Sequence, residues 1–200
     1  MPDGTTIEYL VDGFGRRTWK KVNGVLEKGW IYKDALNPVA ELDGAGNVVS
    51  YFVYGSKSHV PDYMLKLESG SWVKYRFVTD QIGSVRYVIN EATSEVAQEM
   101  TYSPFGVVLE DTYEGFQPFG FAGGVYDETT GLVRFGARDY DSEVGRWTAK
   151  DPILFGGGDT NLYGYVMSDP INYIDMNGLT QKDIDAAVTI INDTLNFFSG

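Results

Sequence analysis

Two aspartates near the end of the chain are the residues whose type and spacing could do chemistry. Asp151 begins an Asp-Pro pair, and Asp175 begins Asp-Met-Asn-Gly 24 residues later. The segment between them is rich in glycine and turn signals and can fold back on itself, so the two side chains can meet. Two carboxyl groups held close together cannot both ionise, and such a pair can activate water and polarise a carbonyl group. The pair titrates as a unit, so neither aspartate is assigned as the base.

Simple turn roles for both aspartates remain an open alternative, because Asp-Pro and Asn-Gly pairs are ordinary turn signals. Other chemistries have less support. The chain has no cysteine and a single histidine, His59, which excludes thiol nucleophiles and sites with several histidine or cysteine ligands. No spacing supports a Ser-His-Asp triad, so we expect His59 to be a loop residue.

Two patterns, one glycine-rich and one acidic, could suggest a ligand-binding site. Gly156-Gly157-Gly158-Asp159 looks like a phosphate loop, but it lacks the following Lys-Ser/Thr and is expected to be a turn. Asp159, Asp169 and Asp175 do not have the spacing of a calcium-binding EF-hand. The sequence therefore predicts no metal and no cofactor.

The charge of the chain argues against a nucleic-acid partner. Sixteen basic and 28 acidic residues give a net charge of -12, and phosphate binding needs clustered Lys and Arg. We interpret the acidity as a means of solubility. Arg134, Arg138 and Arg146 are expected to pair with neighbouring acidic residues.

The elements that must position these residues are short strands. The chain contains 24 Gly, 14 Tyr, 11 Phe and 4 Trp, a composition that favours strands joined by tight turns. Aromatic-led strands recur beside glycine-bearing turns at steps of 23, 22, 21, 27 and 24 residues, starting in turn at Tyr9, Tyr32, Tyr54, Tyr75, Tyr102 and Tyr126. Each step is the length of one hairpin, so the sequence is a tandem repeat of hairpins.

These hairpins predict an all-β fold of sequential antiparallel units over residues 5–165. Residues 48–54 and 85–89 alternate as half-buried strands do, and Asp12-Gly13 and Asp43-Gly44 supply tight turns. Because an isolated hairpin is marginally stable in water, each unit must stack on its neighbours. The repeat aromatics, such as Tyr54, Tyr75 and Tyr102, should therefore share one face.

The end of the chain changes character at Leu179/Thr180. Thr180-Gln-Lys-Asp183 fits a capping box, and apolar residues then follow at helical spacing, which predicts one amphipathic helix over 180–196. No run approaches the roughly 18 apolar residues of a membrane span, and Met1-Pro2-Asp3-Gly4 does not begin a signal segment.

Residues 131–153, Gly-Leu-Val-Arg-Phe-Gly-Ala-Arg-Asp-Tyr-Asp-Ser-Glu-Val-Gly-Arg-Trp-Thr-Ala-Lys-Asp-Pro-Ile, resemble the core signature of the RHS (rearrangement hot spot) or YD-repeat family. The likeness continues through residues 161–166 and 169–179. Residues 5–120 are similar to the looser YD repeats. The resemblance implies a YD-repeat β-strip over 1–120, a core or plug over 121–179, and a variable extension over 180–200. In that family the strip spirals into a hollow, cocoon-like shell that the core closes, and many bacterial members hold a toxin inside.

The resemblance also implies a reaction. Bacterial members often cut themselves after the Leu of a terminal Asp-Pro-x-Gly-Leu, using aspartates from two related motifs. The matching positions are Asp151 and Asp175, with Lys150 in support and the cut at Leu179-Thr180. Both motifs depart from the pattern, because Met176 replaces Pro and Leu154-Phe155 replaces Gly-Leu. A shift of about an ångström in either loop is enough to spoil positioning.

The leading hypothesis is therefore a shell or plug module that encloses or presents a C-terminal polypeptide, with self-cleavage after Leu179 if the aspartates are active. The alternative is a non-catalytic cell-surface module whose exposed Tyr and Trp bind carbohydrate or protein. Expected partners are the rest of a shell, a toxin-like cargo, or further copies joined through open strand edges. Only 21 residues follow Leu179, which suggests a truncated or split member. It is expected to be secreted or at the cell surface, and cytoplasmic before export.

Overall fold

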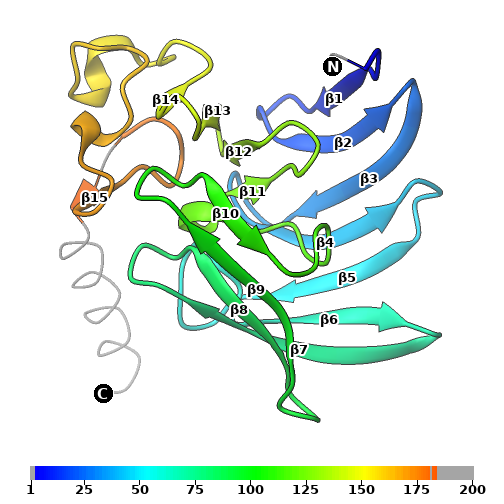
Figure 1. Ribbon diagram of the computed structural model, residues 1–200. Helices are drawn as coiled ribbons and strands as arrows, with labels where there is room; N and C mark the ends of the chain where they lie inside the picture. The colour runs from blue at the N-terminus through cyan, green and yellow to red at the C-terminus, as the bar shows by residue number, and fades with distance from the viewer. Residues whose placement is uncertain (1–2, 181, 184–200) are drawn as a thin grey trace, which may run out of the picture.

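The structure, a computed structural model, describes residues 3–180 and 182–183. Its main element is one sheet of ten antiparallel strands that follow one another in chain order (Figure 1). The strands are β1 Ile7–Val11, β2 Arg17–Val22, β3 Val25–Tyr32, β4 Pro38–Asp43, β5 Val48–Val53, β6 Tyr63–Glu68, β7 Ser71–Thr79, β8 Val85–Asn90, β9 Val96–Tyr102 and β10 Val108–Asp111.

The register of each strand is fixed by the alternation of buried and exposed side chains and by the turns at its ends. In β7 the side chains of Tyr75 and Phe77 are buried, whereas Arg76 and Val78 point to the exposed face, as a period of two requires. The turn between β6 and β7 places Gly70 at φ 82°, a conformation that glycine adopts without steric cost. Every hairpin thus adds one strand beside the last.

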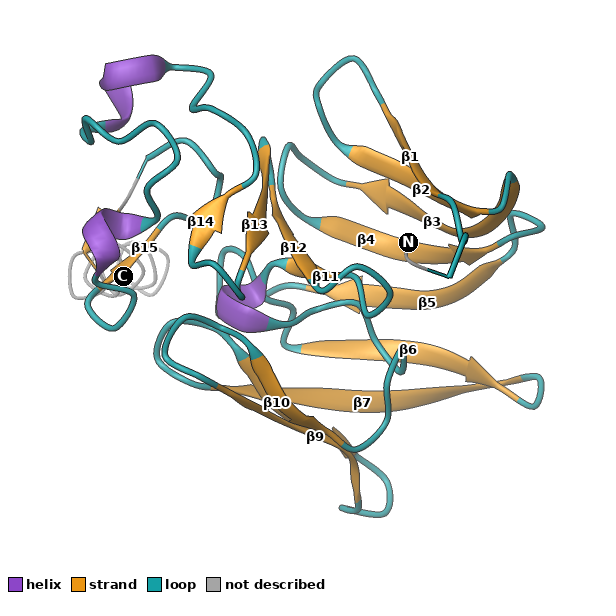
Figure 2. Ribbon diagram, turned by 45° about the horizontal axis from the view of Figure 1, so that its top comes forward, coloured by secondary structure: helices purple, strands orange, loops and turns teal. Residues whose placement is uncertain are grey.

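The sheet curves around the segment that follows β10 (Figures 1 and 2). Phe116 and Phe119 from this segment pack into the bend against buried residues of β5 to β9. Phe119 meets the rings of Phe52 and Phe77 edge to face, at centroid distances of 4.9 and 5.8 Å. These two phenylalanines therefore hold the curved strip in shape.

A second, smaller unit follows in the chain. Four short strands form an antiparallel sheet, and β15 Tyr173–Ile174 pairs with β16 Lys182–Asp183. The remaining elements are 3-10 helix η1 Phe121–Gly123, strands β11 Val125–Tyr126, β12 Leu132–Phe135, β13 Arg138–Asp141 and β14 Arg146–Trp147, and 3-10 helices η2 Leu154–Gly157 and η3 Val166–Ser168. Loops carry most of residues 148–172, and Figure 2 shows them beside β14 and β15.

This unit has its own aromatic core. Phe135, Tyr140, Trp147 and Tyr165 are buried together, with Tyr140 and Tyr165 at 4.4 Å between ring centroids. Phe121 belongs to this second cluster, while Phe119, two residues earlier, belongs to the first.

The predicted fold class is confirmed: the chain is all-β, built from sequential antiparallel hairpins. Tyr75 is buried in the first cluster, and Tyr54 and Tyr102 pack against it, so the repeat aromatics share the inner face. Among the described residues no helix is long and apolar enough to cross a membrane.

The predicted helix over 180–196 falls mainly outside the described residues. Its expected first turn is wrong, because Lys182 and Asp183 form strand β16 against Tyr173 and Ile174. The physical reason lies just before it: side-chain oxygens of Asp175 and Asn177 accept the N–H groups of Leu179 and Thr180 and hold the chain in a turn that leads into this pairing.

Candidate functional site

The two predicted aspartates lie in loops of the second unit. Asp151 follows β14, where its backbone N–H donates to the carbonyl of Leu162 and its Oδ1 accepts the N–H of Ile153 at 2.9 Å. Asp175 follows β15 directly. Their residues are 6% and 3% exposed, so both carboxyl groups are inside the protein.

Arg138 of β13 brings the two carboxyl groups together. Its Nη2 lies 2.9 Å from Oδ2 of Asp151 and 3.3 Å from Oδ2 of Asp175. The guanidinium lies 4.3 Å from the ring centroid of Trp147, which holds it in place. The two aspartates thus share one partner, a buried arginine, and a proton shared between them stays a prediction.

The predicted scissile bond lies in the same place. Oδ1 of Asp175 accepts the N–H groups of Leu179 at 3.0 Å and Thr180 at 3.2 Å. Oδ1 of Asn177 accepts the same two N–H groups at the same distances. Arg138 donates through Nε to the carbonyl of Gly178. The Leu179–Thr180 peptide is therefore clamped from its N–H side by two side chains.

Gly157 of η2 closes the site from the other side. A Cβ atom at this position would lie 2.7 Å from Oδ2 of Asp151 and 2.9 Å from the carbonyl oxygen of Leu179. Both oxygens therefore approach the α-carbon of Gly157, and only glycine leaves room for them. A cavity of about 20 Å³ lies here, lined among others by Asp151, Asp175 and Leu179, which is enough for one water molecule.

Burial sets the electrostatics of the pair. It raises the pKa of the Asp175 carboxyl above its usual 3.8, against the opposing effect of the N–H groups of Leu179 and Thr180 and of the charge of Arg138. Burial also lowers the pKa of Arg138, which the two carboxylates oppose. Asp175 is therefore the carboxyl group that keeps a proton to higher pH than an exposed aspartate does.

Several other expectations concern single residues. Lys150 is exposed and forms no ion pair with the described residues, so Arg138 supplies the cation that Lys150 was expected to supply. Arg138 pairs with acidic residues distant in the sequence rather than with neighbours. His59 lies in the loop between β5 and β6, as expected. Asp169 accepts both side-chain and backbone N–H groups of Asn172 and so is a turn residue.

The sequence does not predict the roles that three residues have in the site: Arg138, Gly157 and Asn177. Gly157 lies in a run read as a turn, and nothing in that run marks which glycine faces a carboxylate. Arg138 alternates with Asp139 in β13, which places one on the buried face and the other on the opposite face. That alternation was the available signal for a buried arginine.

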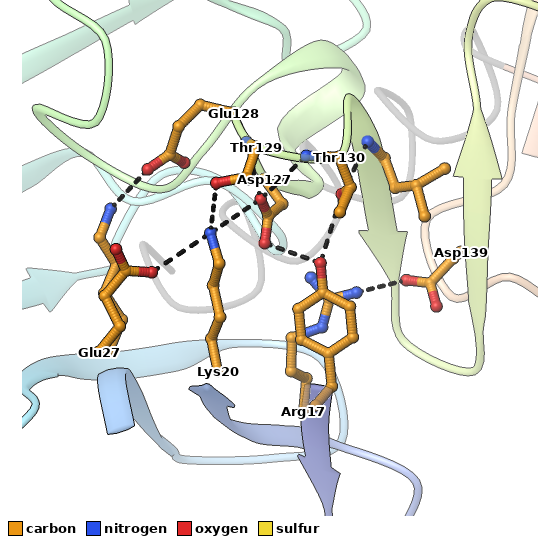
Figure 3. Close-up of polar contacts among 11 residues, drawn as sticks. Arg17, Lys20, Glu27, Asp127, Glu128, Thr129, Thr130 and Asp139 are labelled. Atoms are coloured by element: carbon orange, nitrogen blue, oxygen red, sulfur yellow. Dashed lines mark hydrogen bonds and ion pairs between the residues drawn. The ribbon is translucent and has the colours of Figure 1, made fainter. Parts of the chain in front are cut away.

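The hairpin that carries Arg138 is tied to the start of the strip by ion pairs (Figure 3). Lys20 of β2 lies 3.0 Å from Asp127 and donates to Thr129, and both charged residues are buried. Arg17 of the same strand lies 2.7 Å from Asp139, the residue next to Arg138. Strand β2 therefore fixes the turn before β12 and strand β13 relative to the sheet.

A known protein family matches most of the chain in sequence. The model of the teneurin YD-shell matches residues 2–171, which span the strip and most of the second unit. The chain belongs to the teneurin YD-shell family. The YD-shell assignment agrees with the resemblance to RHS and YD-repeat proteins.

Relatives of this YD-shell chain come from animals and bacteria. Mouse teneurin-1 is 33% identical over 201 residues, covering 98% of the chain and 7% of teneurin-1. Double-stranded DNA deaminase toxin A of Burkholderia cenocepacia (strain H111) is 39% identical over 111 residues, covering 52% of the chain and 8% of the toxin. The chain thus spans less than a tenth of the length of these relatives.

Two solved structures have a similar fold. The crystal structure of TcdB2-TccC3-TEV aligns with 86% of the chain and 9% of its own length, with a TM-score of 0.64 and 21% identity. The Tc holotoxin pore of Photorhabdus luminescens aligns with 90% of the chain and 9% of its own length, at the same TM-score and 19% identity. These likenesses concern the fold.

Proposed function

We propose that this YD-shell module closes one end of a shell and cuts its own chain between Leu179 and Thr180. The single observation that carries the proposal is the convergence of Asp151, Asp175 and the Leu179–Thr180 peptide around Arg138 and a cavity with room for one water molecule. Turn roles alone would not require two carboxyl groups to be buried around one guanidinium, at a cost in desolvation.

The geometry supports different roles for the two aspartates in proton transfer. Water in the cavity adds to the carbonyl carbon of Leu179, and its proton passes to the carboxylate of Asp151. The bond from that carbon to the nitrogen of Thr180 then breaks, and the nitrogen takes a proton from the carboxyl group of Asp175, which is held beside it because its Oδ1 accepts the N–H of Thr180. The raised pKa of Asp175 suits it to donate. The products are a carboxyl group on Leu179 and an amino group on Thr180.

The intact mass of the purified chain tests this proposal. Cleavage gives two fragments, residues 1–179 and 180–200, and Asp151→Asn or Asp175→Asn should abolish it while preserving the fold. Asp169→Asn is the matched control, because Asp169 also precedes a proline but lies outside the cluster and should leave cleavage unchanged. A wild-type chain that stays intact for days at mildly acidic pH would return both aspartates to structural roles.

The shell itself is expected to hold a polypeptide that begins after Leu179. A relative named as a double-stranded DNA deaminase toxin and a solved structure named as a Tc holotoxin pore support a toxin-like cargo or the rest of a shell as partner. A module of this kind acts outside the cell that makes it, as part of a secreted or cell-surface protein. Co-purification of residues 180–200 with the cleaved shell, detected by mass after gel filtration, would test retention.

A further inference from the structure

A row of polar side chains crosses the inner face of the strip, under the segment that follows β10. We call residues 112–128 the covering segment. The members of the polar row lie directly opposite one another on neighbouring strands: Trp30 on β3, Glu41 on β4, Ser50 on β5 and Lys66 on β6. Because directly opposite residues point to the same face, the four side chains form one line across the sheet. Phe52, two residues after Ser50, is in the first aromatic cluster, so the row lies beside that cluster.

Three polar groups of the row are buried without a hydrogen bond. Glu41 is 4% exposed, and its carboxyl group makes no hydrogen bond or ion pair with any described residue. The indole Nε1 of Trp30 and the hydroxyl group of Ser50 are buried and also lack a hydrogen-bond partner in the part of the chain that the structure describes. Buried polar groups are nearly always paired, and a buried carboxylate without a partner is costly. A charged Glu41 is therefore much less favourable in this row than a neutral one.

Two cations that act on Glu41 are both held by the covering segment. The Nζ of Lys66 donates to the carbonyl of Phe116 at 2.7 Å. The Nζ of Lys28 lies 3.0 Å from Oε1 of Glu128. Both contacts tie the covering segment to the sheet, so any change that draws these ammonium groups toward Glu41 weakens the attachment of the segment.

Both cations are close enough to Glu41 for this to happen. Lys28 lies two residues before Trp30 on the same face of β3, which makes it a diagonal neighbour of Glu41. Lys66 is two strands from Glu41, a span of roughly 10 Å between the backbones, and only the small side chain of Ser50 stands between them. Two extended long side chains cover that distance. Glu41 and the covering segment therefore compete for the same two ammonium groups.

The electrostatics of the row depend on pH. Burial raises the pKa of the Glu41 carboxyl above its usual 4.5. Among the described residues, the charges of Lys28 on β3 and Lys66 on β6 oppose this rise, and that of Glu128 in the covering segment adds to it. A raised folded-state pKa means that the stabilisation is fully present below 4.5 and is lost as the pH rises through the folded-state value. The row thus favours the closed arrangement in acid.

We propose that Glu41 is a pH-dependent switch that controls how tightly the covering segment is held on the strip. While its carboxyl group is neutral, Lys28 and Lys66 stay on their partners in the covering segment. Once the carboxyl group ionises, it attracts both ammonium groups, and the covering segment loses its two polar ties to this part of the sheet. The switch is independent of self-cleavage, because no residue of the polar row lines the cavity of the candidate cleavage site.

Hydrogen exchange of the full chain, read by mass spectrometry between about pH 5 and about pH 7, tests the proposal. After correction for the intrinsic pH dependence of amide exchange, the rate in the covering segment should rise by up to about tenfold per pH unit below the folded-state pKa. Glu41→Gln, a neutral residue of similar shape, should keep the covering segment protected and remove this dependence. Glu8→Gln is the matched control, since Glu8 is an exposed glutamate on β1, and should behave as the wild type. Strands β7 and β8 are the internal reference and should not follow the change.

Three results would overturn the proposal. One is a pH profile of Glu41→Gln that runs parallel to that of the wild type. Another is an equal rise of exchange in β7 and β8, which would indicate global unfolding rather than release of the covering segment. The third is slower exchange of the covering segment at higher pH. Titration of the Glu41 carboxyl carbon by NMR in the wild-type chain needs no variant, and a midpoint at or below 4.5 would likewise end the proposal.

Discussion

In the proposed self-cleavage, the side chain of Asn177 holds the Leu179–Thr180 peptide without taking part in proton transfer. Its Oδ1 accepts the N–H groups of Leu179 and Thr180, alongside Asp175. Asn177→Ala should slow self-cleavage about tenfold to a hundredfold, because the peptide loses one of its two anchors and a small misplacement is costly. The rate is read from intact mass over time. Asn47→Ala, in an exposed turn of the strip, is the control, and equal rates in both variants would contradict a positioning role.

The raised pKa of Asp175 has a consequence for stability. Below the usual value of 3.8 the carboxyl is protonated in both states, and the folded state gains from burying it uncharged. As the pH rises from 3.8 through the folded-state pKa, the unfolded chain loses its proton first and this stabilisation is lost. The measurement is the free energy of unfolding in urea of two variants, Asp151→Asn and Asp151→Asn/Asp175→Asn. This free energy should fall with rising pH over the window in the single variant and not in the double variant. Parallel profiles would show that Asp175 is not perturbed.

At the scale of elements, the contact between β2 and the turn before β12 holds the strip to the second unit. Lys20 and Asp127 are 1% and 3% exposed and 3.0 Å apart, while Lys28 and Glu128 are 26% and 29% exposed at the same separation. Lys20→Met should therefore cost about 3–5 kcal/mol of unfolding free energy, since it strands a buried charge. Lys28→Met should cost at most about 1 kcal/mol. Urea unfolding measures both, and equal losses would contradict the role of burial.

The contact between Lys20 and Asp127 loses its stabilising effect in acid. Burial raises the pKa of Asp127, but hydrogen bonds from Tyr9 and Lys20 and the charge of Lys20 outweigh it and hold the pKa below 3.8. Its stabilising contribution is therefore present above pH 3.8 and is lost as the pH falls through the folded-state value.

At the scale of the whole molecule, the ten-stranded sheet ends in two edge strands, β1 and β10, each of which pairs with a neighbour on one side only. Strand β10 carries Glu110 and Asp111, charges that oppose pairing between edges, whereas β1 exposes Leu10 and Val11. The isolated chain should therefore self-associate through β1 in sedimentation experiments, and Leu10→Lys should shift it toward the monomer. Val25→Lys, at an apolar position that is more exposed than Leu10 but lies on the interior strand β3, should not. A monomeric wild-type chain over a wide concentration range would contradict this.

The sequence by itself determined the strand content and the order of the hairpins. Both depend on neighbours a few residues apart, since alternation sets the face of a strand and glycine sets its turn. The repeat steps from Tyr9 to Tyr126 therefore predicted the sheet, and the motifs around Asp151 and Asp175 pointed to two carboxyl groups that contact the same arginine. The division at residue 120 stays a prediction, although Phe119 and Phe121 do pack into different clusters.

Only the tertiary structure decided which residue contacts both of those carboxyl groups. Arg138 is 13 residues from Asp151 and 37 from Asp175, and its partners are chosen by the packing of Trp147 and the loops around it, which no local pattern encodes. No local pattern predicts the role of Gly157 either. A glycine is needed there because oxygens of Asp151 and Leu179, which belong to different segments of the chain, both approach its α-carbon. The strand pairing of Lys182 and Asp183 replaced an expected helical turn for the same reason: long-range contacts with β15 override local propensity.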